Sequence, residues 1–307
     1  MKINLVGLLY DRNMGDPLLF DCTRYLLKTI IGSENCSKDH ITPKEITIEN
    51  TDILQRDTFC QQMNQIEEEK NVQREKYRKV KHILGERIFV LIKDVILFLS
   101  RAKGIRRFRN SEYRRELDDY YQKKFLGADC VIIIGAGTFK YHARMDFGGY
   151  YESIISVCHK LEIPVIISCV GIESMYDRLD PRCYRFVKCV NHPIVKYITT
   201  RDKLSHIIPY IKTPHLKINQ CTDVGVYASK AYNITKDIHS KIIGIGIITY
   251  KRFVEFGRGI SKELYENLIY DIISEFENSQ VDWLFFNNGD NEDASYQSYL
   301  CLNSATL

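Results

Sequence analysis

The 307-residue chain is long enough for one large domain or two domains of medium size. Its composition, 45% hydrophobic and 27% charged, is typical of a globular protein with a sizeable core and excludes a disordered or fibrous chain. The formal net charge of +4 is small, but lysine and arginine are concentrated in residues 70–124, whereas the final residues are acidic on balance. Attraction to an anionic partner is therefore expected from that basic segment.

Cysteine usage and hydropathy point to a reduced compartment. The ten cysteines contain no CxxC pair, and several stand inside apolar runs, which favours buried thiols over disulfides or a zinc site. The first apolar run ends at Asp11, which is too short for a signal peptide, and no segment reaches the roughly 20 apolar residues of a membrane span. We expect a cytoplasmic protein without a metal.

Short β-branched runs alternate with helical stretches in residues 1–228, a pattern that predicts βαβ units and a parallel sheet. Strands are expected at 2–10, 130–134, 165–170 and 196–199, with a last short one within 220–226. After the first strand, Asp16 and Pro17 suit the N-cap and first position of a helix that extends to Lys28.

A second, shorter region follows a polar linker at 229–240. Its pattern predicts a strand at 242–248, a helix at 262–277 and a strand at 281–286. A doubly wound domain usually takes about 100 residues or more. We therefore expect an α/β protein with two Rossmann-like domains, a first at 1–228 and a truncated second at 241–307.

Residues 61–124 are expected to be a helical, basic insertion in the first domain. Residues 61–87 are highly charged, and the apolar residues that follow recur at spacings of three and four. The two sets are Leu84, Ile88, Leu91, Val95, Phe98 and Ala102, then Arg101, Lys103, Arg106, Arg107 and Arg109. Two interpretations stay open: a helical hairpin packed on the domain, or an interfacial membrane helix over 84–109 whose basic end meets anionic headgroups. Nucleic acid is disfavoured, because no interleaved aromatic residues or known binding motif accompany the charge.

Ligands of open α/β sheets bind beyond the carboxyl ends of the strands. Three such ends, at 13–16, 135–144 and 199–202, carry polar or glycine-rich sequences and are expected to line one rim. The Gly135-Ala136-Gly137-Thr138 turn can offer backbone N–H groups to an oxyanion. It is not the dinucleotide-binding pattern GxGxxG, because Lys140 stands where the third glycine would be.

Three basic residues follow this turn at alternate positions: Lys140, His142 and Arg144. In an extended loop they would share one side, as a phosphorylated carboxylate would require. His142 is the group that can move a proton near neutral pH, although it could equally be a structural histidine. Likewise, Arg201 could form an ion pair with Asp202 or Asp223, and Asp16 could simply cap a helix.

Five segments in chain order resemble the polysaccharide pyruvyl transferases. They are the Asn13-x-Gly15-Asp16 segment, GAGTF at 135–139, IPVIISCVGIE at 163–173, ITTRDKLS at 198–205 and CTDVGV at 221–226. The similarity extends from residue 4 to about residue 290, apart from 61–124. It implies a two-domain fold like that of the GT-B glycosyltransferases. It also implies transfer of the enolpyruvyl group of phosphoenolpyruvate onto a sugar, as a ketal, during cell-surface polysaccharide synthesis.

The candidate roles follow from this chemistry, which needs a proton donor, cations and a base. His142 is the candidate acid and Asp146 the candidate base. The candidate substrate-binding residues are Asn13, Gly15, Asp16, Gly135, Gly137, Thr138, Lys140, Arg144, Arg201, Lys251 and Arg252. Phosphoenolpyruvate would be the donor, a sugar or lipid-linked saccharide the acceptor, and no cofactor is expected.

The chain departs from the family in one respect. Family members carry an arginine-x-histidine element late in the second domain, and no such element follows residue 258 here. We therefore expect a shortened member. Two alternatives remain: a GT-B-like glycosyltransferase that uses a nucleotide sugar, and a non-catalytic homologue that binds an anionic sugar or a membrane surface.

Overall fold

The computed structural model describes residues 1–9, 15–32, 46–54, 86–141, 146–214, 216–235, 237, 239–246, 248–250, 253–254, 260–276 and 281–286. The chain divides into two compact units. The first comprises Met1–Leu9 and Leu19–Ala231, and the second comprises Tyr10–Leu18 and Tyr232–Leu307.

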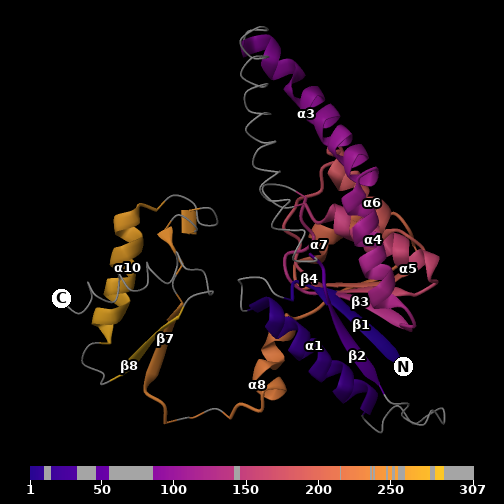
Figure 1. Cartoon of the computed structure of the whole chain (residues 1–307). Helices are drawn as coiled ribbons and strands as arrows, with labels where there is room; N and C mark the ends of the chain where they lie inside the picture. The colour runs from indigo at the N-terminus through magenta and orange to yellow at the C-terminus, as the bar shows by residue number, and fades with distance from the viewer. Residues whose placement is uncertain are drawn as a thin grey trace. The chain divides into compact units, whose positions relative to one another are not determined.

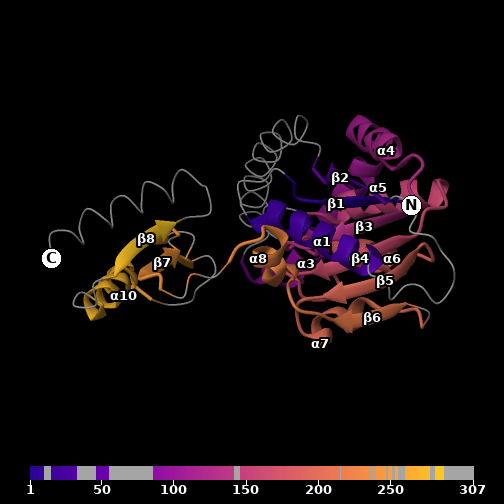
Figure 2. The same ribbon diagram turned by 90° about the horizontal axis from the view of Figure 1, so that it is seen from below.

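The first unit contains a six-stranded sheet in the order β2-β1-β3-β4-β5-β6, which Figure 2 shows. The strands are β1 (Lys2–Gly7), β2 (Thr47–Asp52), β3 (Cys130–Ile134), β4 (Val165–Val170), β5 (Val195–Thr200) and β6 (Lys217–Gln220). Every neighbouring pair is parallel. The unit is thus α/β and Rossmann-like in its general organisation, which confirms the expected fold class at this level.

Helices lie on both faces of the sheet (Figure 1). The helices of this unit are α1 (Gly15–Gly32), which belongs to it from Leu19 on, α3 (Glu86–Arg109), α4 (Glu112–Phe125), α5 (Gly148–Lys160), α6 (Pro181–Val190), α7 (Leu204–Ile207) and α8 (Ala228–Ala231). Phe20 of α1 packs against Ile3 and Ile134 on one face. Asn4, which points to the other face, donates from its side-chain amide to the Lys124 carbonyl of α4, 3.1 Å away.

The strands expected at 130–134 and 165–170 are confirmed residue for residue, whereas the strand expected at 2–10 ends at Gly7, the last expected strand was wrong and one strand was missed. The last strand is β6, not a segment within 220–226. There the Asp223 side chain accepts a hydrogen bond from the Gly225 amide, 2.8 Å away, and begins a 3-10 turn (η3, Val224–Tyr227). Strand β2 was missed because its sequence, TIENTD, is mostly polar, as an edge strand can be.

Two helices of the first unit differ from their expected limits. α1 begins at Gly15, so Asp16 lies in its first turn, and it continues past Lys28 to Gly32. α3 continues to Arg109, so the basic residues expected to follow the apolar helix are part of it.

α4 lies within the segment expected to be an insertion, yet it is an integral helix of the sheet's crossover. Its residues Leu117, Tyr121 and Phe125 are fully buried, and it leads directly into β3. The Tyr121 hydroxyl donates to the Ile53 carbonyl, 2.6 Å away.

The described part of the second unit is a βαβ arrangement of β7 (Ile242–Gly246), α10 (Lys262–Glu275) and β8 (Asp282–Phe286). β7 and β8 pair in parallel. Tyr265 and Ile269 of α10 are buried, and Ile245 is among the residues that pack against them. Ser261 caps α10 by accepting from the Leu264 amide.

Candidate functional site

The carboxyl ends of β3, β4 and β5 meet at one edge of the sheet. The Gly171 amide, after β4, donates to the Ala136 carbonyl, after β3, over 2.9 Å. The Ile172 amide donates in turn to the Asp202 carboxylate, after β5, over 2.5 Å. The structure therefore brings the 135–140 and 199–202 segments to one rim, as parallel strands require.

The turn after β3 is tight and partly left-handed. Gly135 and Ala136 have φ values of 41° and 54°. A Cβ on Gly135 would lie 2.5 Å from Leu19 Cδ1, so this position requires glycine for both space and conformation. Thr138 is fully buried, with its hydroxyl 2.9 Å from that of Tyr151. The Thr138 side chain therefore belongs to the core.

A carboxylate lies against this turn. A Cβ on Gly137 would be only 1.5 Å from Glu173 Oε1, so the Glu173 carboxylate occupies the space that a side chain at position 137 would take. The other oxygen, Glu173 Oε2, is 2.6 Å from Lys140 Nζ. The Gly135–Thr138 turn and Lys140 thus already lie against a carboxylate, which is the kind of group that an oxyanion ligand would replace.

Arg201 is held in a similar way. Its Nη1 donates to Asp223 Oδ2 over 2.6 Å, so the ion pair foreseen as an alternative is present. Partial burial would lower the pKa of Arg201, but the hydrogen bond and charge of Asp223 raise it above its usual value. A Cβ on Gly171 would lie 3.0 Å from Arg201 Nε, which shows that Gly171 leaves room for the guanidinium.

Asp146, the candidate base, has structural partners. It accepts a hydrogen bond from the Gly148 amide, 2.9 Å away, at the start of α5. It also pairs with Arg185, whose side chain is almost entirely buried. Arg185 Nε has no hydrogen-bond partner among the described residues, so the Asp146 contact is important for keeping this guanidinium in the interior.

The remaining candidates divide into two groups. Gly15 and Asp16 begin α1, where Asp16 is buried. Asn13, His142, Arg144, Lys251 and Arg252 lie outside the described residues. The proposed alternation of Lys140, His142 and Arg144 on one side of a loop therefore stays a prediction.

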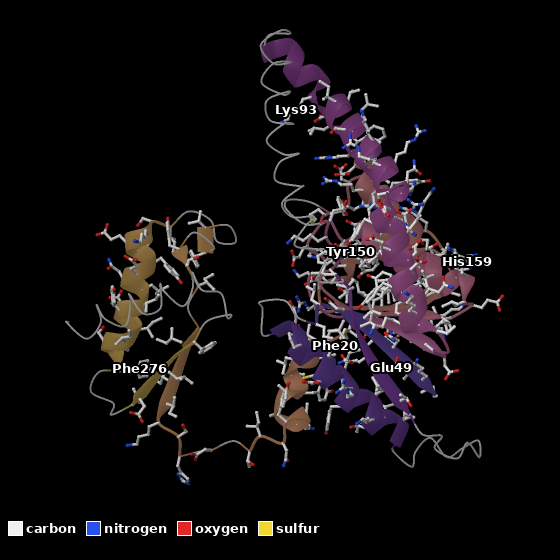
Figure 3. The ribbon with its side chains drawn as sticks, viewed as in Figure 1. Phe20, Glu49, Lys93, Tyr150, His159 and Phe276 are labelled. Carbon is white, nitrogen blue, oxygen red and sulfur yellow. The ribbon has the colours of Figure 1, made fainter. Side chains whose placement is uncertain are left out.

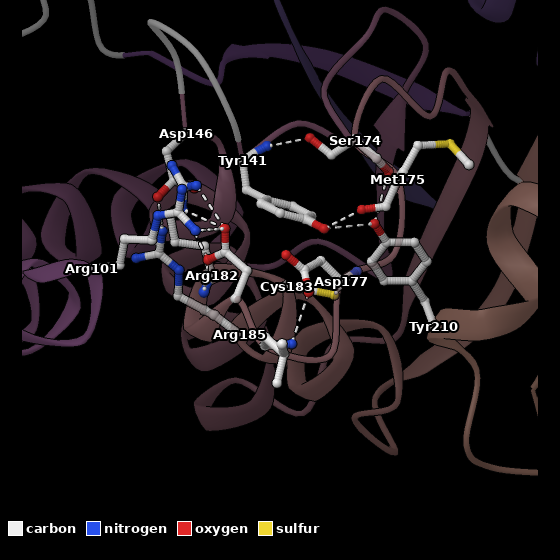
Figure 4. A network of polar contacts seen from close by, with 12 residues as sticks. Arg101, Tyr141, Asp146, Ser174, Met175, Asp177, Arg182, Cys183, Arg185 and Tyr210 are labelled. Carbon is white, nitrogen blue, oxygen red and sulfur yellow. Dashed lines mark hydrogen bonds and ion pairs between the residues drawn. The ribbon is translucent and has the colours of Figure 1, made fainter. Parts of the chain in front are cut away.

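Sequence reasoning missed a polar network that fixes the loops after β3 and β4 to each other (Figure 4). The Tyr141 amide donates to Ser174 Oγ over 2.8 Å, and the Tyr141 hydroxyl donates to the Met175 carbonyl. The Tyr210 hydroxyl donates to the Ser174 carbonyl, 2.8 Å away. Burial raises the pKa of both tyrosines, so they stay neutral donors that hold the rim in place. From sequence alone, a tyrosine that joins two loops by hydrogen bonds cannot be distinguished from one that only packs in the core.

A second part of the same network surrounds Asp180, which begins α6. Its Oδ2 is 2.7 Å from Arg182 Nη2 and 2.9 Å from Arg101 Nη1, so it joins α3 to α6. Burial works to raise the pKa of Asp180, but the hydrogen bonds and charge of Arg182, together with the charge of Arg101, lower it below its usual value.

Within the described residues, no three His, Cys, Asp or Glu side chains are grouped so that they could hold a metal ion. In the same part of the chain, no helix has the length and apolar character needed to cross a bilayer. Neither protein-family models nor curated proteins yielded a match to this chain.

Proposed function

We propose that this protein is a pyruvyl transferase, with a two-domain architecture like that of the GT-B enzymes, which binds phosphoenolpyruvate at the carboxyl edge of the first sheet. The observation that supports the proposal is the meeting of Lys140, Arg201 and the Gly135–Thr138 turn at this one edge, each of the two cations beside a carboxylate. The choice of reaction comes from the resemblance of these same segments to the pyruvyl transferases.

The donor carries a carboxylate and a phosphate, so it needs at least two cationic or N–H-rich positions. Lys140 and Arg201 supply two cations that are now neutralised by Glu173 and Asp223. Glu173 is exposed, so its carboxylate can turn toward solvent when a ligand anion replaces it. Asp223 also accepts a hydrogen bond from the Gly225 amide, so at Arg201 the ligand would have to compete with a carboxylate that stays in place. Ligand binding at Lys140 would then be an exchange of anions around a fixed cation.

The proposed reaction begins with protonation of the donor's methylene carbon, with His142 as the acid. A sugar hydroxyl attacks the resulting oxocarbenium carbon and loses its proton. The carbon–oxygen bond to phosphate breaks, and a second hydroxyl of the sugar closes the ketal as phosphate leaves with a proton. Asp146 would accept the hydroxyl proton only after a change of partner, because it now pairs with Arg185.

Isothermal titration calorimetry with phosphoenolpyruvate tests the donor site. Arg201→Gln and Lys140→Gln should each weaken binding about 10- to 100-fold, since a hydrogen bond to a charged group is worth about 1.5–3 kcal/mol. Arg115→Gln, at an exposed position on α4, removes the same charge elsewhere and should leave binding unchanged. Glu173→Gln should strengthen binding because it removes the competing anion.

The transfer step has its own test. His142→Ala should abolish phosphate release in the presence of donor and a saccharide acceptor while keeping donor binding. Absence of donor binding by the wild-type chain would refute the proposal. Binding of a uridine or guanosine diphosphate sugar in its place would favour the glycosyltransferase alternative.

A further inference from the structure

The C-terminal half of α3 packs on the α/β unit, and its N-terminal half extends beyond it. Figure 1 shows the helix projecting from the sheet and its helices, and Lys93 lies on the projecting half in Figure 3. The other half is anchored: Ile105 is buried, Arg101 pairs with Asp180, and Arg109 Nε lies 2.6 Å from Glu152 Oε1. The anchored half thus holds out a segment in which Lys93, Asp94 and Val95 are exposed.

The projecting half is unusually apolar for an exposed helix. Residues 88–99 contain only two charged residues, Lys93 and Asp94. Val95, Phe98 and Leu99 are 59%, 44% and 60% exposed, although such side chains are usually buried. An apolar helix surface in water indicates a docking site.

Basic side chains continue the same surface toward the anchored end. Lys103, Arg106 and Arg107 are all exposed. Val95, Leu99, Lys103 and Arg106 follow one another at intervals of four, four and three residues, so they share one face of the helix. We call these four residues, together with the neighbouring exposed Phe98, the α3 surface.

We propose that the α3 surface docks on an anionic lipid bilayer, with its apolar side chains in the interfacial layer and its basic side chains on the headgroup phosphates. The combination of apolar and basic residues on one convex helix matches the two-layer chemistry of such an interface. Basic residues near an anionic membrane strengthen binding, and the apolar residues add binding that salt does not screen.

Other occupants fit this surface less well. A second copy in parallel orientation would bring like charges together, and one in antiparallel orientation would place Lys103 and Arg106 against Val95 and Leu99. A nucleic acid would pair with the basic residues but leave Phe98 and its apolar neighbours without a partner. The inference is independent of the proposed transfer reaction.

Sedimentation of the full chain with vesicles tests the proposal. We expect binding to vesicles of phosphatidylcholine and phosphatidylglycerol, and none to phosphatidylcholine alone. Lys103→Glu with Arg106→Glu should weaken this binding at least about tenfold. Phe98→Ser with Leu99→Ser should also weaken it and make the residual binding more sensitive to salt.

The matched control reverses two exposed lysines elsewhere, Lys123→Glu with Lys160→Glu, for the same change in net charge. This control should keep binding, and circular dichroism should show that every variant is folded. Equal loss in control and test variants, or no binding by the wild-type chain, would overturn the proposal. So would a dimer in sedimentation velocity that Phe98→Ser with Leu99→Ser dissociates, or binding to duplex DNA in preference to anionic vesicles.

Discussion

Replacement of Asp180 separates two roles that one carboxylate performs. Asp180 caps α6 by accepting from the Arg182 amide over 2.9 Å, and it also pairs with the side chains of Arg182 and Arg101. Asp180→Asn keeps a good capping group but removes the charge, whereas Asp180→Ala removes both. The two variants therefore measure the ion pairs and the cap independently.

The size of the expected destabilisation depends on how exposed Arg101 and Arg182 are. Breaking a buried ion pair costs about 3–5 kcal/mol when the remaining charge stays buried. The side chains of Arg101 and Arg182 are 32% and 19% exposed, so both can regain water. We therefore expect Asp180→Asn to lower the free energy of unfolding by about 2 kcal/mol, and Asp180→Ala by about 1 kcal/mol more for the cap.

The stabilisation by the Asp180 carboxylate should decrease at acidic pH. The pKa of Asp180 is lowered in the folded protein, against the opposing effect of burial, by Arg182 and Arg101. The stabilisation is therefore complete above the ordinary carboxyl pKa of 3.8 and is lost as the pH falls through the lower folded value. The difference between wild type and Asp180→Asn should shrink in that acidic range.

Urea unfolding followed by far-UV circular dichroism measures these differences. Equal stability of wild type and Asp180→Asn at neutral pH would refute the reasoning. A difference that persists unchanged at acidic pH would show that the charge is not its cause.

Three further predictions concern the sheet and its core. Gly135→Ala should lower the free energy of unfolding by about 2–3 kcal/mol in urea, because it adds both a left-handed strain and a clash. Tyr121→Phe should cost about 1–2 kcal/mol by the same measurement, because it leaves the buried Ile53 carbonyl without its donor. Burial raises the pKa of the Cys158 and Cys189 thiols to about 12, so mass spectrometry should find neither alkylated by iodoacetamide in the native protein near neutral pH.

Matched positions provide the controls. Gly127 also has a positive φ but open space around it, so Gly127→Ala should cost only about 1 kcal/mol, and equal costs at both glycines would contradict the clash with Leu19. Tyr184→Phe, at an exposed position, should leave the free energy of unfolding unchanged. If Tyr121→Phe also left it unchanged, the hydrogen bond to Ile53 would not contribute to stability. Half-buried Cys221 should react before Cys158, and early modification of Cys158 would show that the core opens locally.

The sequence by itself determined the parallel α/β character and two central strands, because fully buried strands must be apolar along their whole length. β3 and β4 come close to this, since both are mostly buried and only Ser168 of β4 is polar, and their limits are visible as apolar runs. It also placed the Gly135–Thr138 turn and Arg201 at strand ends, since local patterns mark where a strand stops.

Only the tertiary structure decided which groups meet. Glu173 against Gly137, the pairing of Arg201 with Asp223 rather than Asp202, and the role of Asp146 beside Arg185 depend on side chains that are distant in sequence. The polar edge strand β2 and the buried position of α4 were hidden for the same reason. Pairing and burial are properties of neighbours in space, whereas hydrophobic periodicity records only how one segment divides between core and solvent.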